Sequence, residues 1–107
     1  MDSQQRLEDN YLRDKKRLAE KEERLYQQKN KGMQALDAIA EASHYYLKDF
    51  ATDTMDIRRG MHQLEEIKEE LAVQHRKEQQ RLDYEMEELT LDYRRQQRTS
   101  SEQEASL

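Results

Sequence analysis

The sequence predicts an all-α fold, a single antiparallel hairpin of two long helices with coiled-coil-like arms. Pro and Cys are absent from the 107 residues, Gly occurs only twice, and 40% of the residues are charged. Glu, Gln, Lys, Arg and Ala dominate the composition, and these residues favour helix, whereas Pro and Gly interrupt it. Because so little in the chain stops a helix, the architecture depends on where the chain turns back.

The first helix is expected over residues 3–49. Along it, one stripe of apolar or small residues recurs every seven positions, as on one face of a coiled coil. Its members are Tyr11, Leu18, Leu25, Gly32, Ile39 and Tyr46. Few other residues between positions 12 and 33 are apolar, so this arm offers thin anchorage for a partner helix.

The bend is expected near residues 49–54. This segment is rich in residues that cap helix N-termini; Asp53 can cap the second helix, and Asp56 lies in its first turn. Gly32 and Gly60 are alternative bend sites, because each follows basic residues and has the chemistry of a helix C-cap.

The pairing of side chains favours the bend near residue 51. It makes large and small residues alternate sensibly across the two arms, whereas a bend at Gly60 leaves Leu7 and Tyr11 without partners. A bend at Gly32 would give three helices. The expected facing pairs are Tyr46 with Ile57, Ile39 with Leu64, Gly32 with Leu71, Leu18 with Met86, and Tyr11 with Tyr93.

The second helix is expected over residues 54–98. Its apolar stripe has a period near 3.6 residues if His75 and Glu78 fill a gap, which indicates a straight amphipathic helix and not a strict heptad. The stripe consists of Ile57, Met61, Leu64, Ile67, Leu71, Leu82, Met86, Leu89 and Tyr93. Residues 99–107 lose the pattern and are expected to form a disordered tail, so that residues 1–98 make up one domain.

Composition also narrows the class of protein. The N-terminus lacks the apolar core of a signal peptide, and no stretch is apolar enough to span a membrane, so we expect a cytoplasmic protein without membrane insertion. Export by a route without a signal peptide is the alternative. The net charge of -5, with bases and acids interleaved, counts against a nucleic-acid partner.

No constellation of residues predicts catalysis. Glu41 and His44 match the Glu-x-x-His spacing of di-iron helical bundles, but such sites need a second copy, and neither His62 nor His75 follows a Glu at that spacing. We therefore expect no enzyme, no catalytic residue, no metal ligand and no cofactor.

The apolar centre of the chain predicts a protein-binding surface instead. Between residues 33 and 51 apolar residues occupy more than one face, so they exceed what the second helix can cover. The alternative is that this segment binds nothing, the alanines only favour helix and the tyrosines lie half exposed. The residues expected to bind a partner are Met33, Leu36, Tyr45, Tyr46, Leu47 and Phe50.

A chain of this length that forms one helical hairpin, with an aromatic residue at Phe50 near the bend, resembles the WXG-type hairpins of type VII secretion. The Trp-x-Gly bend motif is missing. The Gln-, Arg- and Glu-rich arms and the lack of Trp are more similar to the LXG-associated α-helical (Lap) proteins of type VIIb secretion. That resemblance implies a targeting factor that binds the N-terminal helical domain of an LXG toxin, together with a second small helical protein.

The Tyr-x-x-x-Asp/Glu export signal of type VII substrates can be matched at Tyr84 to Glu88 and at Tyr45 to Asp49, although neither match follows the second helix. Two alternative functions fit the same shape. One is a coiled-coil stalk or chaperone of a type III or flagellar export apparatus. The other is a structural homodimer that forms a four-helix bundle.

Overall fold

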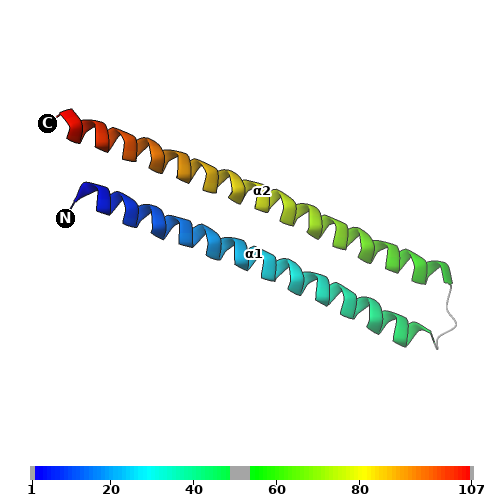
Figure 1. The fold of residues 1–107 in the computed structure, drawn as a ribbon. Coiled ribbons are helices and arrows are strands. Elements are labelled where there is room, and N and C mark those ends of the chain that lie inside the picture. Colours follow the sequence, from blue (N-terminus) through cyan, green and yellow to red (C-terminus); the bar gives the residue numbers. More distant parts are fainter. Residues whose placement is uncertain (1, 49–53, 107) are drawn as a thin grey trace. The chain divides into compact units, whose positions relative to one another are not determined.

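The computed structural model describes residues 2–48 and 54–106. Helix α1 spans Ser3–Leu47 and helix α2 spans Thr54–Ser106 (Figure 1). No strand occurs in the described part of the chain, and the predicted all-α helical hairpin is confirmed. The segment expected to form the bend, including Asp49, Phe50 and Asp53, lies outside the described residues, between the end of α1 and the start of α2.

Local hydrogen bonds mark both ends of α1. The Asp2 carboxylate accepts a hydrogen bond from the Gln4 amide at 3.2 Å, and the Asp2 carbonyl accepts one from the Arg6 amide at 3.1 Å. Asp2 is therefore the N-cap of the helix. At the other end, the Lys48 amide donates to the His44 carbonyl at 3.2 Å. The helix stops at Leu47, two residues before the end expected at residue 49.

Helix α2 is longer than the sequence analysis predicted, because it continues to Ser106 and not to residue 98. The prediction of a disordered tail was based on the loss of apolar periodicity. That loss removes packing against another helix, but it leaves the helix propensity of the residues unchanged. Residues 99–106 contain neither Pro nor Gly. The Thr99 hydroxyl donates a hydrogen bond to the Arg95 carbonyl at 3.0 Å, so the polar group of this residue has a partner within the helix.

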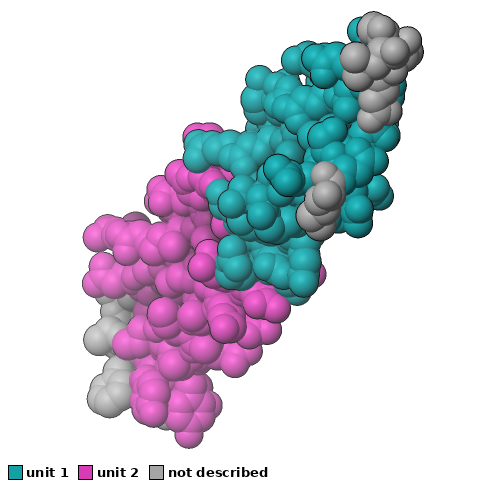
Figure 2. Space-filling view, turned by 90° about the vertical axis from the view of Figure 1, so that its left-hand side faces the viewer, with its two compact units in different colours: residues 1–24, 79–107 teal, residues 25–78 magenta. Residues whose placement is uncertain are grey.

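The chain divides into two compact units, each built from a piece of both helices (Figure 2). Unit 1 contains residues 1–24 and 79–107, and unit 2 contains residues 25–78. The sequence analysis expected one domain. In each unit α1 and α2 run antiparallel, since Gln4 approaches Ser101 and Tyr11 approaches Tyr93 in unit 1, while Gly32 approaches Leu71 in unit 2.

The packing of unit 1 centres on a stacked pair of tyrosines. The rings of Tyr11 and Tyr93 lie 4.2 Å apart between centroids and are inclined by 13°. The Thr90 hydroxyl donates to the Met86 carbonyl at 3.0 Å, so the Tyr11 hydroxyl, 3.4 Å from Thr90 Oγ1, is the donor in that contact. Leu82 is only 4% exposed and is the sole buried residue among the side chains that the structure describes.

In unit 2 the closest approach of the helices occurs at Gly32. A Cβ atom at this position would lie 2.7 Å from Leu71 Cδ2, so Leu71 fills the space that a side chain would occupy. One turn away, Lys68 Nζ forms an ion pair with Asp37 and lies 3.6 Å from Glu65 Oε1. The predicted pairing of Gly32 with Leu71, like that of Tyr11 with Tyr93, is therefore confirmed.

Two residues of the predicted α1 stripe are largely exposed. Ile39 is 51% exposed, although it lines the same hollow as Leu64, and Tyr46 is 66% exposed. The expected pairing of Tyr46 with Ile57 stays a prediction. A straight helix has 3.6 residues per turn, and a strict seven-residue series drifts by about 20° per heptad. From Tyr11 to Tyr46 the drift is about 100°. Half-buried positions near this end of α1 are instead Leu36, Ala40 and Ser43.

The stripe on α2 also differs from the predicted one. Ile67 is 47% exposed, whereas the neighbouring Lys68 is half-buried. Among the buried or half-buried residues, one series follows steps of four and three, a heptad pattern, and Gly60, Ala72, Val73 and Gln79 lie beside it. The series is Ile57, Met61, Leu64, Lys68, Leu71, His75, Glu78 and Leu82. Apolar periodicity places Ile67 in the stripe instead of Lys68, because it takes no account of the ion pair that Asp37 can form with a lysine in the seam.

Candidate protein-binding surface

The residues expected to bind a partner divide into two groups. Met33 and Leu36 are half-buried on α1, while Tyr45, Tyr46 and Leu47 are exposed at its C-terminal end. Phe50, the sixth expected residue, lies outside the described residues. The exposed group belongs to unit 2, and whether it binds a protein stays a prediction.

The exposed tyrosines form a small aromatic cluster. Tyr45 is 62% exposed, and its ring meets the Tyr46 ring edge to face, with centroids 5.4 Å apart and planes at 85°. Lys48 Nζ lies 4.9 Å from the Tyr45 centroid, within range of a cation–π interaction. Tyr, with a large apolar surface and a hydroxyl that can still form hydrogen bonds, is a residue type enriched at protein interfaces.

An apolar hollow lies in unit 2 near the C-terminal end of α1, and sequence reasoning missed it. Its volume is about 230 Å³. Both helices line it, with Ile39, Ser43 and Leu47 from α1 and Asp56, Ile57, Gly60, Met61 and Leu64 from α2. The sequence indicates Gly60 as a possible helix C-cap, yet this residue lies inside α2. The sequence feature that could have indicated the hollow is a glycine in the interior of a helix, at a position where no turn requires it.

The candidate export signal lies within α2 in unit 1. Tyr84 is exposed and Glu88 is half-buried, and the two residues line a shallow hollow with Asp14, Arg17 and Leu18 of α1. Tyr84 is accessible, but its place within the helix differs from that of the family signal.

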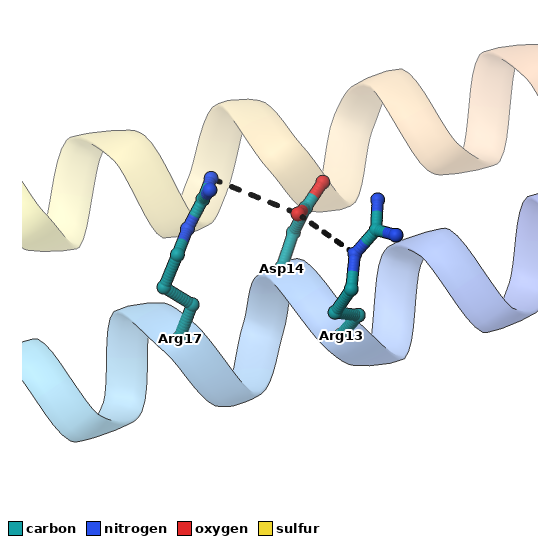
Figure 3. A network of polar contacts seen from close by, with 3 residues as sticks. All are labelled: Arg13, Asp14 and Arg17. Atoms are coloured by element: carbon teal, nitrogen blue, oxygen red, sulfur yellow. Dashed lines mark ion pairs between the residues drawn. The ribbon is translucent and has the colours of Figure 1, made fainter.

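Asp14, which lines the same hollow, forms ion pairs with two arginines. In Figure 3, Arg13 and Arg17 lie on either side of Asp14; Asp14 Oδ1 is 3.9 Å from Arg13 Nε and 3.6 Å from Arg17 Nη2.

Several charged side chains form ion pairs. His62 Nε2 lies 3.0 Å from Glu66 Oε1, and Arg59 Nη1 lies 3.8 Å from Asp56 Oδ1. The hydrogen bond from Lys68 to Asp37, opposed by partial desolvation and assisted by the charges of Asp37 and Glu65, raises the pKa of Lys68 above its usual 10.5. Over residues 2–48 and 54–106, no cluster of three or more metal-ligating side chains occurs.

Comparison of the chain with protein-family models, with curated proteins and with solved structures finds no match. Neither helix, over the residues described, has a stretch that is both long and apolar enough to cross a membrane.

Proposed function

We propose that the chain is a non-catalytic helical adaptor that binds helices of a partner protein. The observation that carries this proposal is the thin core, since a single described residue, Leu82, is buried. The accessible surface is 8904 Å², whereas a compact monomer of 13.0 kDa exposes about 6,300 Å². The difference of about 2,500 Å² exceeds the roughly 800 Å² per partner that a standard interface covers.

The partner that the sequence resemblance favours is the N-terminal helical domain of an LXG toxin, with a second Lap protein as a further component. In this proposal the chain acts in the cytoplasm as a targeting factor and completes a helical bundle for type VII export. Tyr84 and Glu88 are proposed as the export signal if the chain leaves with its partner.

The aromatic cluster of unit 2 is the proposed docking face for that toxin domain. Tyr45, Tyr46 and Leu47 are exposed, and the edge-to-face rings can become the desolvated anchors that dominate binding energies once a partner covers them. Half-buried Met33 and Leu36, together with Phe50, extend the proposed face on the basis of the sequence.

The experiment is co-expression of the chain with the LXG domain encoded beside it, followed by affinity capture and measurement of Kd. We expect Tyr45→Ala, Tyr46→Ala and Phe50→Ala each to weaken binding by about tenfold. Tyr26→Ala is the matched control, because Tyr26 is an exposed tyrosine of α1 in unit 2 that is not part of the proposed docking face. Absence of capture contradicts the proposed function, and unchanged affinity in all three variants contradicts the docking face alone.

A further inference from the structure

The two glycines of the chain both lie inside helices, but only one is explained by the chain itself. An interior helix Gly is less favourable than Ala by about 1 kcal/mol. At Gly32 the absence of a side chain lets Leu71 approach, since a Cβ atom there would lie 2.7 Å from Leu71 Cδ2. A Cβ atom at Gly60 would meet no atom within 4 Å. Among the described residues, nothing uses the space over Gly60.

That space is the apolar hollow of about 230 Å³ in unit 2. A cavity of about 150 Å³ lined by apolar side chains admits a benzene molecule, so this hollow has room for one branched aliphatic side chain. Ile39 and Leu47 border it from α1, and Met61 and Leu64 border it from α2. Gly32 and Leu71 show, within the same chain, how a helix glycine receives such a side chain.

A suitable side chain lies on α2 itself, one heptad from the hollow. Ile67 is 47% exposed, although it is a large aliphatic residue in the middle of a helix. Seven residues separate it from Gly60, which places the two positions about 20° apart around the helix and about 10 Å apart along it. Ile67 therefore cannot fill the hollow of its own chain, but it lies on the same flank of α2.

We propose that a second copy of this chain docks on this flank, with the two α2 helices antiparallel and centred on residues 63 and 64. In that arrangement Ile67 of each copy enters the hollow over Gly60 of the other. The contact is reciprocal, as a two-fold symmetric interface requires. This inference goes beyond the adaptor function proposed above and does not depend on it.

The charges around the hollow agree with this pairing. Arg59 of one copy would lie between Glu66 and Glu70 of the other, within about two residues of each along the helix, and all three residues are exposed. Asp56, which lines the hollow, already has Arg59 at 3.8 Å in its own chain. Opposite charges in these positions favour the antiparallel register and disfavour a slipped one.

The other flank of the helix pair in unit 2 is less suited to a second copy. Lys68, Asp37 and Glu65 form a polar network there, with Lys68 Nζ 3.6 Å from Glu65 Oε1. Glu65 and Ile67 are two positions apart, which turns them about 160° from each other around α2. The side with Gly60 and Ile67 therefore lies away from this polar network.

The test is the mass in solution of the full chain and two single variants, by light scattering after gel filtration. We expect the wild type to have twice the 13.0 kDa mass of one chain. Gly60→Ile fills the hollow, and Ile67→Ala removes the side chain that enters it. The dissociation constant of the dimer should therefore rise by about tenfold or more in each variant alone. Leu12→Ala, which truncates an exposed leucine of unit 1, should leave the mass unchanged.

Mixing the two variants is the decisive step. In a mixed dimer the side chain added by Gly60→Ile faces the space that Ile67→Ala leaves in the other copy. The second contact pairs the unchanged Ile67 of the first variant with the unchanged Gly60 of the second, so the mixture should regain the dimer mass. Circular dichroism checks that each variant is helical.

Several outcomes would overturn the proposal: a monomeric wild type, a dimer that neither variant weakens, or a mixture that stays monomeric. A monomeric wild type whose Gly60→Ile variant no longer binds the LXG domain would also overturn it, and would assign the hollow to that partner.

Discussion

Lys68 is the residue whose environment departs most from what its type predicts. It occupies a position of the seam that an apolar residue would normally fill, and its ammonium group reaches Asp37 across the helix pair of unit 2. Its aliphatic stem can cover apolar surface while the charged end meets the carboxylates. A single charged residue in a helix seam costs stability compared with a well-packed apolar one, but it fixes the register of the two helices.

The raised pKa of Lys68 gives a prediction with a definite sign. The folded state holds the proton more tightly than the unfolded chain, so the stabilisation is fully present below pH 10.5 and is lost as the pH rises through the folded-state pKa. Compared with Lys68→Met, the wild type should therefore lose free energy of unfolding above pH 10.5 and keep a constant difference between about pH 7 and 9. Urea unfolding at each pH measures this difference.

Lys77→Met is the control for that titration, because Lys77 is exposed on the same helix of the same unit. It subtracts the general effect of removing one lysine charge from the chain. A difference between wild type and Lys68→Met that stays flat to about pH 12, or one that Lys77→Met reproduces, would contradict the role given to the pair with Asp37.

At the scale of the helices, the register was predictable and the exact faces were not. Gly32 could be matched to Leu71 and Tyr11 to Tyr93 from the sequence, because complementary sizes recur on both sides of one assumed bend. Apolar periodicity places Ile39 in the seam, yet this residue is exposed. A sequence of isolated apolar residues is compatible with periods of both 3.5 and 3.6, and only the partner helix decides between them.

Among the described residues of unit 1, Leu82 is the one buried anchor of the helix pair, and truncating it should have a disproportionate effect. Leu82→Ala removes a side chain that is 4% exposed, so we expect it to lower the free energy of unfolding by about 2 kcal/mol, the low end for buried leucines because the surrounding core is thin. Leu12→Ala, in the same unit but at an exposed residue, should cost less than about 0.5 kcal/mol. Urea titrations followed by circular dichroism compare the two, and equal losses would refute the anchor role of Leu82.

At the scale of the whole molecule, composition predicts a thin core, and whether the chain needs a partner stays a prediction. Charged residues make up 40% of the chain and hydrophobic residues 34%, which leaves little apolar area to bury. The sequence did identify the apolar segment that contains Tyr45 and Tyr46. The hollow over Gly60 could not be found in the same way, because it exists only where residues of both helices border an unfilled space.

A chain with so thin a core should gain much of its stability from binding. A ligand that binds only the folded state stabilises it by about 2.7 kcal/mol at a concentration of 100 times Kd. For a domain of this size, each kcal/mol moves Tm by about 4 to 8 °C. We therefore expect the purified LXG domain, added at that excess, to raise the Tm of the adaptor by about 10 °C or more. Melting followed through a fluorescent label on the adaptor separates its transition from that of the toxin domain.

The control is a Tyr45→Ala, Tyr46→Ala double variant. Because both rings are exposed, their loss should leave the Tm of the chain alone nearly unchanged while removing most of the shift caused by the LXG domain. A wild-type Tm that does not respond to saturating LXG domain would contradict the proposed adaptor function. An equal shift in wild type and double variant would instead assign the docking of the toxin domain to another face, since the coupling between binding and folding would then be independent of the aromatic cluster.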